Sequence, residues 1–302
     1  MLIWNGLKKR AGRILAAVGA LTAGGCATPE VAAAEVQPKP ALWKLADADT
    51  TIYLFGTIHL LPKGLDWRTP ALDQAIAQSG ELYLETVIDK DAIESAKAVK
   101  TLGMAEGLPP LVERVPEEKR AALAERIATL GLKPGQLDRF ETWAAAMTLL
   151  SASFKELGLE SELGVERALE ARYANKKVSG LETVGQQFGF LDGLSEEGQR
   201  LFLEGVLDDP ADARANFADM LKAWAAGDVE GIAANFDAET ALSPELREVL
   251  MTRRNATWAE WLAKRLDQPG TLMVAVGAGH LAGKDSVQAM LAGKGLTVER
   301  VQ

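Results

Sequence analysis

Two apolar, β-rich runs near opposite ends of this 302-residue chain each finish in the pattern Gly-x-x-His. Residues 51–55 lead into Gly-Thr-Ile-His at 56–59, and residues 272–276 lead into Gly-Ala-Gly-His at 277–280. His59 and His280 are the only histidines in the sequence. A single such histidine is often a satisfied core or turn residue. Two placed alike, just past probable buried strands, predict chemistry instead, because imidazole is a proton carrier and metal ligand at neutral pH.

The first 25 residues have the pattern of an export signal. Four basic residues lie between positions 8 and 13, and residues 14–23 are apolar but too few to span a bilayer. Residues 21–26, Leu-Thr-Ala-Gly-Gly-Cys, then resemble the lipobox of bacterial lipoproteins, in which the cysteine is acylated and becomes the mature N-terminus. Two other interpretations are a free cysteine, or ordinary cleavage near residues 32–34.

Lipidation of Cys26 would attach the protein to the membrane through its N-terminus, with residues 26–39 as a tether and residues 40–302 as the folded domain. Ala27 at the next position predicts sorting to the outer membrane, with the domain in the periplasm. Cys26 is the only cysteine, so the folded part has no thiol for disulfides, catalysis or zinc. Removing the four basic residues of the signal changes the net charge from −9 to −13, which argues against a nucleic-acid partner.

Hydrophobic periodicity predicts strands at both ends and in the middle of the domain, with helices between them. Residues 41–45 and 51–55 predict a hairpin, and four further strands are expected at 81–86, 178–181, 271–276 and 296–301. Helical spacing covers residues 68–79, most of 89–173 and 196–266, and 285–291. The expected fold class is α/β (α+β), with a central mixed sheet built from N- and C-terminal segments and large helical insertions.

Four strand ends carry polar side chains: residues 56–59, Glu85, Glu182 and residues 277–280. Ligands collect at the carboxyl ends of strands in open α/β sheets, so two imidazoles and two carboxylates converge if these strands are neighbours. Two histidines with one carboxylate would leave a metal position open for water, and a second carboxylate could act as general base. Glu85 could instead be a solvated strand-end residue, and Glu182 or Thr183 could simply cap the next helix.

Several segments together resemble one known family. They read Leu-Trp-Lys-Leu at 42–45, Tyr-Leu-Phe-Gly-Thr-Ile-His-Leu at 53–60, Leu-Tyr-Leu-Glu-Thr at 82–86, Gly-Leu-Glu-Thr at 180–183 with Gln186, Arg254-Asn255 with Trp258, and Val-Gly-Ala-Gly-His-Leu-Ala-Gly at 276–283. In this order they resemble the TraB/GumN/Tiki family, from about residue 40 to the end of the chain.

The resemblance implies a fold related to the erythromycin-esterase and ChaN-like group. By analogy with Tiki proteins it also implies a metal-dependent protease that prefers manganese or cobalt to zinc. His59, His280 and Glu85 correspond to the metal ligands, and Glu182, Arg254 and Asn255 to other motif positions. Thr57 and Asn255 are the candidate substrate-binding residues. Where many relatives have Gly-[Ile/Val]-Asp, this chain has Gly-Val-Glu at 164–166, so a carboxylate is kept at Glu166.

The leading hypothesis is therefore a lipid-anchored periplasmic metallohydrolase that cleaves peptide bonds, with Glu182 or Arg254 assisting proton transfer or stabilising an oxyanion. One alternative is a protein that binds and sequesters a peptide without cleaving it. Another is a metal-independent esterase in which a histidine is the base.

Overall fold

The computed structural model describes residues 37–87, 93–157, 159, 163–207, 210–240 and 243–302. The expectations for the signal and for Cys26 fall outside these residues. Within the described part of the chain, no helix is both long enough and apolar enough to cross a membrane.

Six strands form one mixed sheet in the order β4-β3-β5-β2-β1-β6. Strands β2 (Thr50–Thr57), β3 (Glu81–Leu84), β4 (Lys177–Gly180) and β5 (Gly270–Gly277) are all parallel to one another. Strand β1 (Leu42–Ala46) is antiparallel both to β2 and to β6 (Val298–Arg300). The predicted hairpin, the mixed sheet and the α/β class are thus confirmed.

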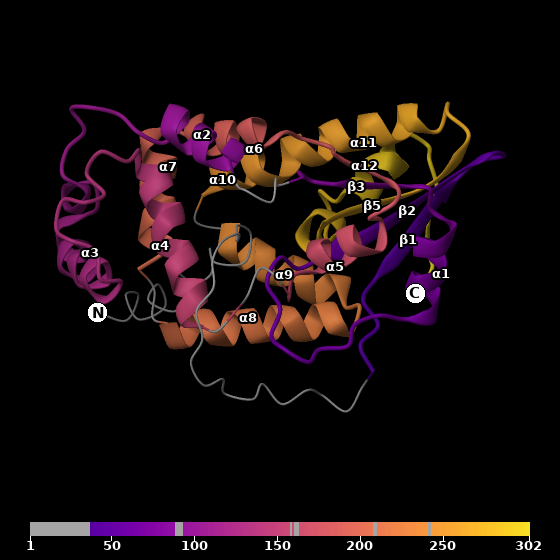
Figure 1. Ribbon diagram of the computed structural model, residues 1–302, viewed down its shortest axis with the longest axis horizontal. Helices are drawn as coiled ribbons and strands as arrows, with labels where there is room; N and C mark the ends of the chain where they lie inside the picture. Colours follow the sequence, from indigo (N-terminus) through magenta and orange to yellow (C-terminus); the bar gives the residue numbers. More distant parts are fainter. Residues whose placement is uncertain (1–36, 88–92, 158, 160–162, 208–209, 241–242) are drawn as a thin grey trace.

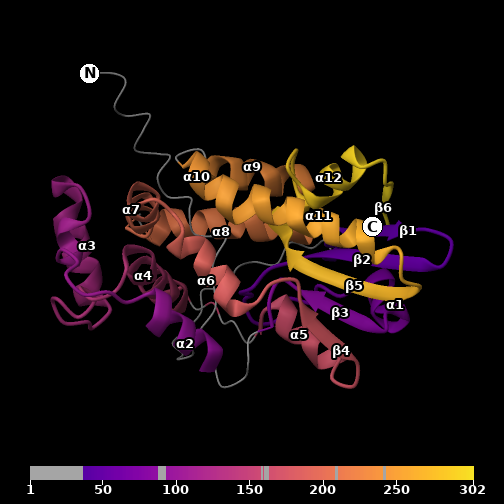
Figure 2. The ribbon, with the colours of Figure 1, turned by 90° about the horizontal axis from the view of Figure 1, so that it is seen from above.

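Alternation along β5 explains why both faces of the sheet are covered. Leu272 and Val274 face one apolar cluster, which includes Trp258 of α11 (Arg253–Arg265) and Leu291 of α12 (Val287–Gly293). Met273 faces the other cluster, which includes residues of α1 (Pro70–Gln78), α5 (Val165–Arg172) and α8 (Pro210–Ala225). Figure 2 shows α11 and α12 on one side of the strands and α1 and α5 on the other.

The helical insertions build a second region beside the sheet, with its own apolar cluster (Figure 1). Its elements are α2 (Ile93–Leu102), the 3₁₀ turn η2 (Leu111–Glu113), α3 (Glu117–Thr129), α4 (Thr142–Glu156), α6 (Val184–Asp192) and α7 (Glu196–Gly205). Helix α8 joins this region to the sheet, since Ala213 packs in the helical cluster and Trp224 beside the strands. Between α8 and α12, besides α11 and β5, the chain forms α9 (Val229–Thr240), α10 (Pro244–Arg247), η4 (Glu248–Thr252) and η5 (Ala278–Leu281).

Candidate active site

The two Gly-x-x-His segments lie side by side. Strands β2 and β5 pair in parallel register, with Gly56 opposite Val276 and Thr57 opposite Gly277. The glycine at 56 permits a close approach of the two segments, since a Cβ there would lie 3.1 Å from the Cα of Ala278, a tight contact. Sequence similarity between the two segments therefore corresponds to spatial adjacency at the carboxyl edge of the sheet.

Glu85 follows β3, the other neighbour of β5, and lies beside both motifs. Its Oε1 accepts a 2.7 Å hydrogen bond from the backbone N–H of Gly277 and lies 3.6 Å from Nε2 of His280. A Cβ added to Gly277 would be 3.0 Å from Glu85 Oε1 and 3.9 Å from His59 Nε2. The structure thus brings His59, Glu85 and His280 around one glycine.

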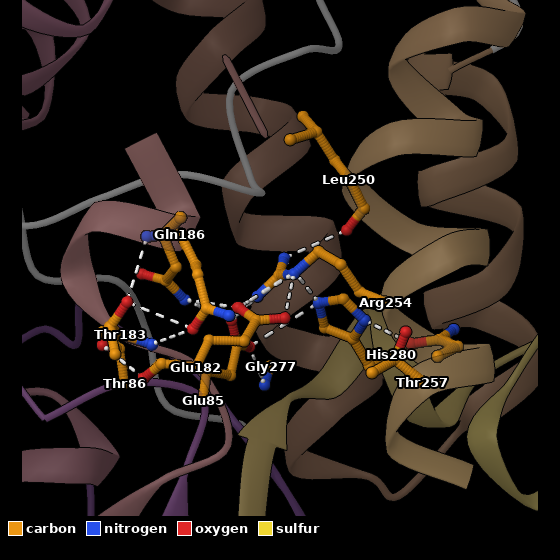
Figure 3. Close-up of polar contacts among 12 residues, drawn as sticks. Glu85, Thr86, Glu182, Thr183, Gln186, Leu250, Arg254, Thr257, Gly277 and His280 are labelled. Atoms are coloured by element: carbon orange, nitrogen blue, oxygen red, sulfur yellow. Dashed lines mark hydrogen bonds and ion pairs between the residues drawn. The ribbon is translucent and has the colours of Figure 1, made fainter. Parts of the chain in front are cut away.

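Arg254, on the first turn of α11, connects the carboxylates to His280 (Figure 3). Its Nη2 donates to Glu85 Oε2 at 2.6 Å, its Nε donates to Glu182 Oε1 at 2.9 Å, and its Nη1 lies 3.3 Å from His280 Nε2. The preceding π-helical turn η4 supplies the Leu250 carbonyl, which accepts a further bond from Nη1. The guanidinium also lies over the ring of Trp258, 4.8 Å from its centroid.

The carboxylates of Glu85 and Glu182 and the guanidinium of Arg254 stabilise one another away from solvent. Burial alone would raise the pKa of Glu85, but the Arg254 guanidinium, together with the nearby imidazoles of His280 and His59 and the Gly277 N–H, outweighs burial and holds that pKa well below its usual range. Burial would lower the pKa of Arg254, while Glu85 and Glu182 raise it. Glu85 is thus a partly buried, ionised residue, with a side chain only 12% exposed, and is not a solvated strand end.

The capping alternative for Glu182 is resolved by its neighbour. Thr183 is the N-cap of α6, and together with Gln186 it forms a reciprocal capping box. Glu182 is left to bind Arg254, and its side chain is 6% exposed.

His280 is held neutral. Because Arg254 donates to its Nε2, its Nδ1 carries the proton and donates to Asn255 Oδ1 at 2.5 Å. The Asn255 amide is itself oriented by a 2.7 Å bond from its Nδ2 to the Asp285 carbonyl. Burial, with Arg254 nearby, lowers the pKa of His280 to about 3.

His59 has the opposite character. Its Nδ1 lies 2.8 Å from Oε1 of Glu166, on the first turn of α5, and its side chain is 31% exposed, against 6% for His280. The start of α5 is fixed to the motif, since the N–H of Val165 donates to the Ile58 carbonyl. Burial would lower the pKa of His59, but the Glu166 carboxylate raises it to about 9. The sequence kept a carboxylate at 166 but did not indicate its partner.

A pocket of about 60 Å³ opens between these residues and a set of helices, with room for about four water molecules. Thr57, His59, Glu85, Arg254 and His280 line its polar side. Six large apolar side chains complete the lining, and together they form what we call the apolar wall: Phe154, Phe217, Met220, Phe236, Leu250 and Met251. Sequence patterning assigned these residues to helical segments but not to a common wall.

The two candidate substrate-binding residues have different places. Thr57 lines the pocket. Asn255 is 1% exposed and contacts His280 from behind, as a residue that orients an imidazole does. Contact of either residue with a substrate stays a prediction.

The donor atoms do not fit a divalent metal as they are arranged. In the described ranges, no three or more His, Cys, Asp or Glu side chains are grouped so that they could hold an ion. The Arg254 guanidinium contacts both His280 Nε2 and Glu85, the atoms that a metal would need. A fixed positive charge at the ligand atoms opposes a second cation there.

The chain is a mixed α/β protein with a His/Glu/Arg cluster at the carboxyl edge of its parallel strands. The chain belongs to the TraB/PrgY/gumN family, whose model matches residues 41–300. The uncharacterized protein YbaP of Escherichia coli (strain K12) is 26% identical over 83% of this chain and 92% of its own length. YbaP of Shigella flexneri is 28% identical over 79% and 87% of the two chains. An uncharacterized protein of Treponema pallidum (strain Nichols) is 23% identical over 81% and 78%. No solved structure matches the chain.

Proposed function

We propose that this protein is a hydrolase of amide or ester bonds in which His59, oriented by Glu166, takes a proton from the attacking water. The observation that carries the proposal is the Glu166–His59 pair: Nδ1 is held by a carboxylate, while Nε2 lies beside Gly277 and Glu85 in the pocket lining. A carboxylate behind an imidazole fixes the ring and stabilises the imidazolium that forms on proton transfer.

The other residues have supporting roles in this proposal. Arg254 lies at the polar side of the pocket, where its guanidinium can stabilise negative charge that develops on a carbonyl oxygen. Glu182 and Glu85 hold that guanidinium in place. His280, neutral and fixed by Asn255, offers its Nε2 as an acceptor that orients Arg254.

A metal-dependent peptidase is the second candidate. It is favoured by the 3.6 Å spacing between His280 Nε2 and Glu85 Oε1, since two ligands of one ion lie about this far apart. Binding of manganese or cobalt, or else zinc, would need Arg254 to withdraw from His280 Nε2 and from the Glu85 carboxylate, which it contacts at Oε2. Attachment to the outer membrane through a lipid on Cys26, with the site facing the periplasm, belongs to the same proposal and rests on the N-terminal sequence.

The test is hydrolysis of fluorogenic ester and peptide substrates by the full-length protein, with and without a chelator. The proposal expects turnover that persists with chelator and falls about 10²–10⁴-fold in His59→Gln. Turnover that stops with chelator and returns with Mn²⁺ or Co²⁺ would favour the second candidate. Saturable peptide binding without any product would favour a sequestering protein.

A further inference from the structure

The apolar wall of the pocket comes from four elements that are separate in the chain. Phe154 is on α4, Phe217 and Met220 are on α8, Phe236 is on α9, and Leu250 and Met251 are on η4. Of these six, Phe154 and Met220 are buried and the other four are partly exposed. Covering large apolar side chains that stay partly exposed inside a concave site with an apolar group removes their surface from water, which lowers the free energy of the complex.

The second glycine of the C-terminal motif fixes the distance between this wall and the polar side. A Cβ added to Gly279 would lie 2.5 Å from two ring carbons of Phe236. The Phe236 ring therefore packs directly on the backbone one residue before His280. An apolar group that touches Phe236 is thereby placed close to the polar side of the pocket.

The charges in the lining restrict which ligands the pocket can hold. His59 faces Glu166, and Arg254 faces both Glu85 and Glu182, so these charged groups already have partners of opposite sign. A charged group of a ligand would lose its hydration and gain no such partner. A neutral ligand loses much less on entering, so the pocket favours a neutral amide or ester.

We propose that the apolar wall is a specificity site for one bulky aromatic or aliphatic side chain next to the bond presented to His59. The substrate class is then a neutral acyl compound, a peptide or an ester, that carries such a side chain. Space for about four waters is close to the size of an aromatic ring. The cleavage of that bond rests on the proposed function, whereas the preference in binding does not.

The experiment therefore measures binding in a protein that need not turn over. Full-length His59→Gln is titrated by calorimetry with three amides. Two are neutral, the methylamides of N-acetyl-phenylalanine and N-acetyl-alanine, and the third, N-acetyl-glutamate methylamide, carries a negative charge. The expected order is phenylalanine tightest, by about ten-fold or more over alanine, with glutamate weakest. In Phe217→Ala and Phe236→Ala the ratio of the affinity for the phenylalanine amide to that for the alanine amide should fall toward one.

Phe140→Ala is the matched control, since Phe140 is a partly buried phenylalanine of the helical cluster and is not part of the pocket lining. It should leave the ratio unchanged. Equal affinities for phenylalanine and alanine amides, or no binding of the phenylalanine amide at millimolar concentration, would overturn the inference even if the wall variants do not fold. A clear preference in a wild-type protein that cleaves nothing would keep this inference and discard the hydrolase.

Discussion

Glu166 Oε1 lies 2.8 Å from His59 Nδ1, and this contact makes two histidines with the same sequence motif chemically different. His59 is held as an imidazolium up to a pKa of about 9, while His280 is neutral down to a pKa of about 3. Both lie at the same edge of the sheet, on neighbouring strands. One of them is thus able to transfer a proton, and the other is a fixed acceptor for Arg254.

The pH dependence of hydrolysis should follow His59. Below a pKa of about 9 its imidazolium keeps the proton and cannot accept one from water, so kcat/KM should rise with pH and level off near 9. Glu166→Gln removes the charge that raises this pKa, so the rise should move to lower pH, with a lower plateau. A profile that is the same in both proteins would contradict the role of Glu166.

Arg254 should be more important for stability than an ordinary surface arginine. Arg254→Met leaves Glu85 and Glu182 buried without their cation, which is expected to cost about 3–5 kcal/mol of unfolding free energy. Arg253→Met is the matched control, because that side chain is 68% exposed and pairs with Glu248 at the surface. Its cost should stay within about 0.5 kcal/mol. Urea unfolding measures the loss of unfolding free energy in each variant. Equal losses in the two variants would contradict a stabilising role of the Arg254 network.

Divalent metal should compete with the guanidinium. Mn²⁺ titrated into the wild-type protein is expected to bind more weakly than into Arg254→Met, because the arginine contacts the would-be ligand atoms of His280 and Glu85. Glu182→Gln weakens the hold on Arg254 and should give a smaller gain in affinity. Tight stoichiometric binding to the wild type, lost in His280→Ala, would show instead that the arginine gives way to metal.

Gly279 should not tolerate a methyl group. In Gly279→Ala the new Cβ meets the Phe236 ring at 2.5 Å, which should destabilise the fold by about 1–3 kcal/mol. Gly189→Ala, inside α6 with no atom within 4 Å of a new Cβ, should instead be neutral or stabilising by up to about 1 kcal/mol. Thermal unfolding compares the two, and a neutral Gly279→Ala would contradict the packing of the apolar wall on the motif.

Local patterns were sufficient to predict the sheet and the meeting of its strand ends. Apolar β-rich runs at 51–55 and 271–276 indicated β2 and β5, and their common Gly-x-x-His ending indicated one edge. Capping of the next helix by Glu182 or Thr183 was left open by the sequence, and the structure gives that role to Thr183 with Gln186. These features depend on residues close in sequence or on repeated motifs.

The partners of the site residues could not be predicted, because they depend on how distant helices pack. Nothing near Glu166 in the chain indicates that α5 is tied to the Ile58 carbonyl and so faces His59. The same holds for the bond from the Trp224 indole N–H to the Gly56 carbonyl, which anchors α8 at the motif. Arg254 was predicted as part of a site, but its position over the candidate metal ligands follows from the π-helical turn before α11.

An NMR titration of the imidazole resonances in the full-length protein shows directly whether the two histidines differ in charge. Only two histidines are present, and His59→Gln assigns them. We expect the His59 imidazole to titrate near pH 9 and the His280 imidazole to stay neutral over the whole range in which the protein is folded. Two ordinary titrations near pH 6.5, or a charged His280 at neutral pH, would contradict this expectation.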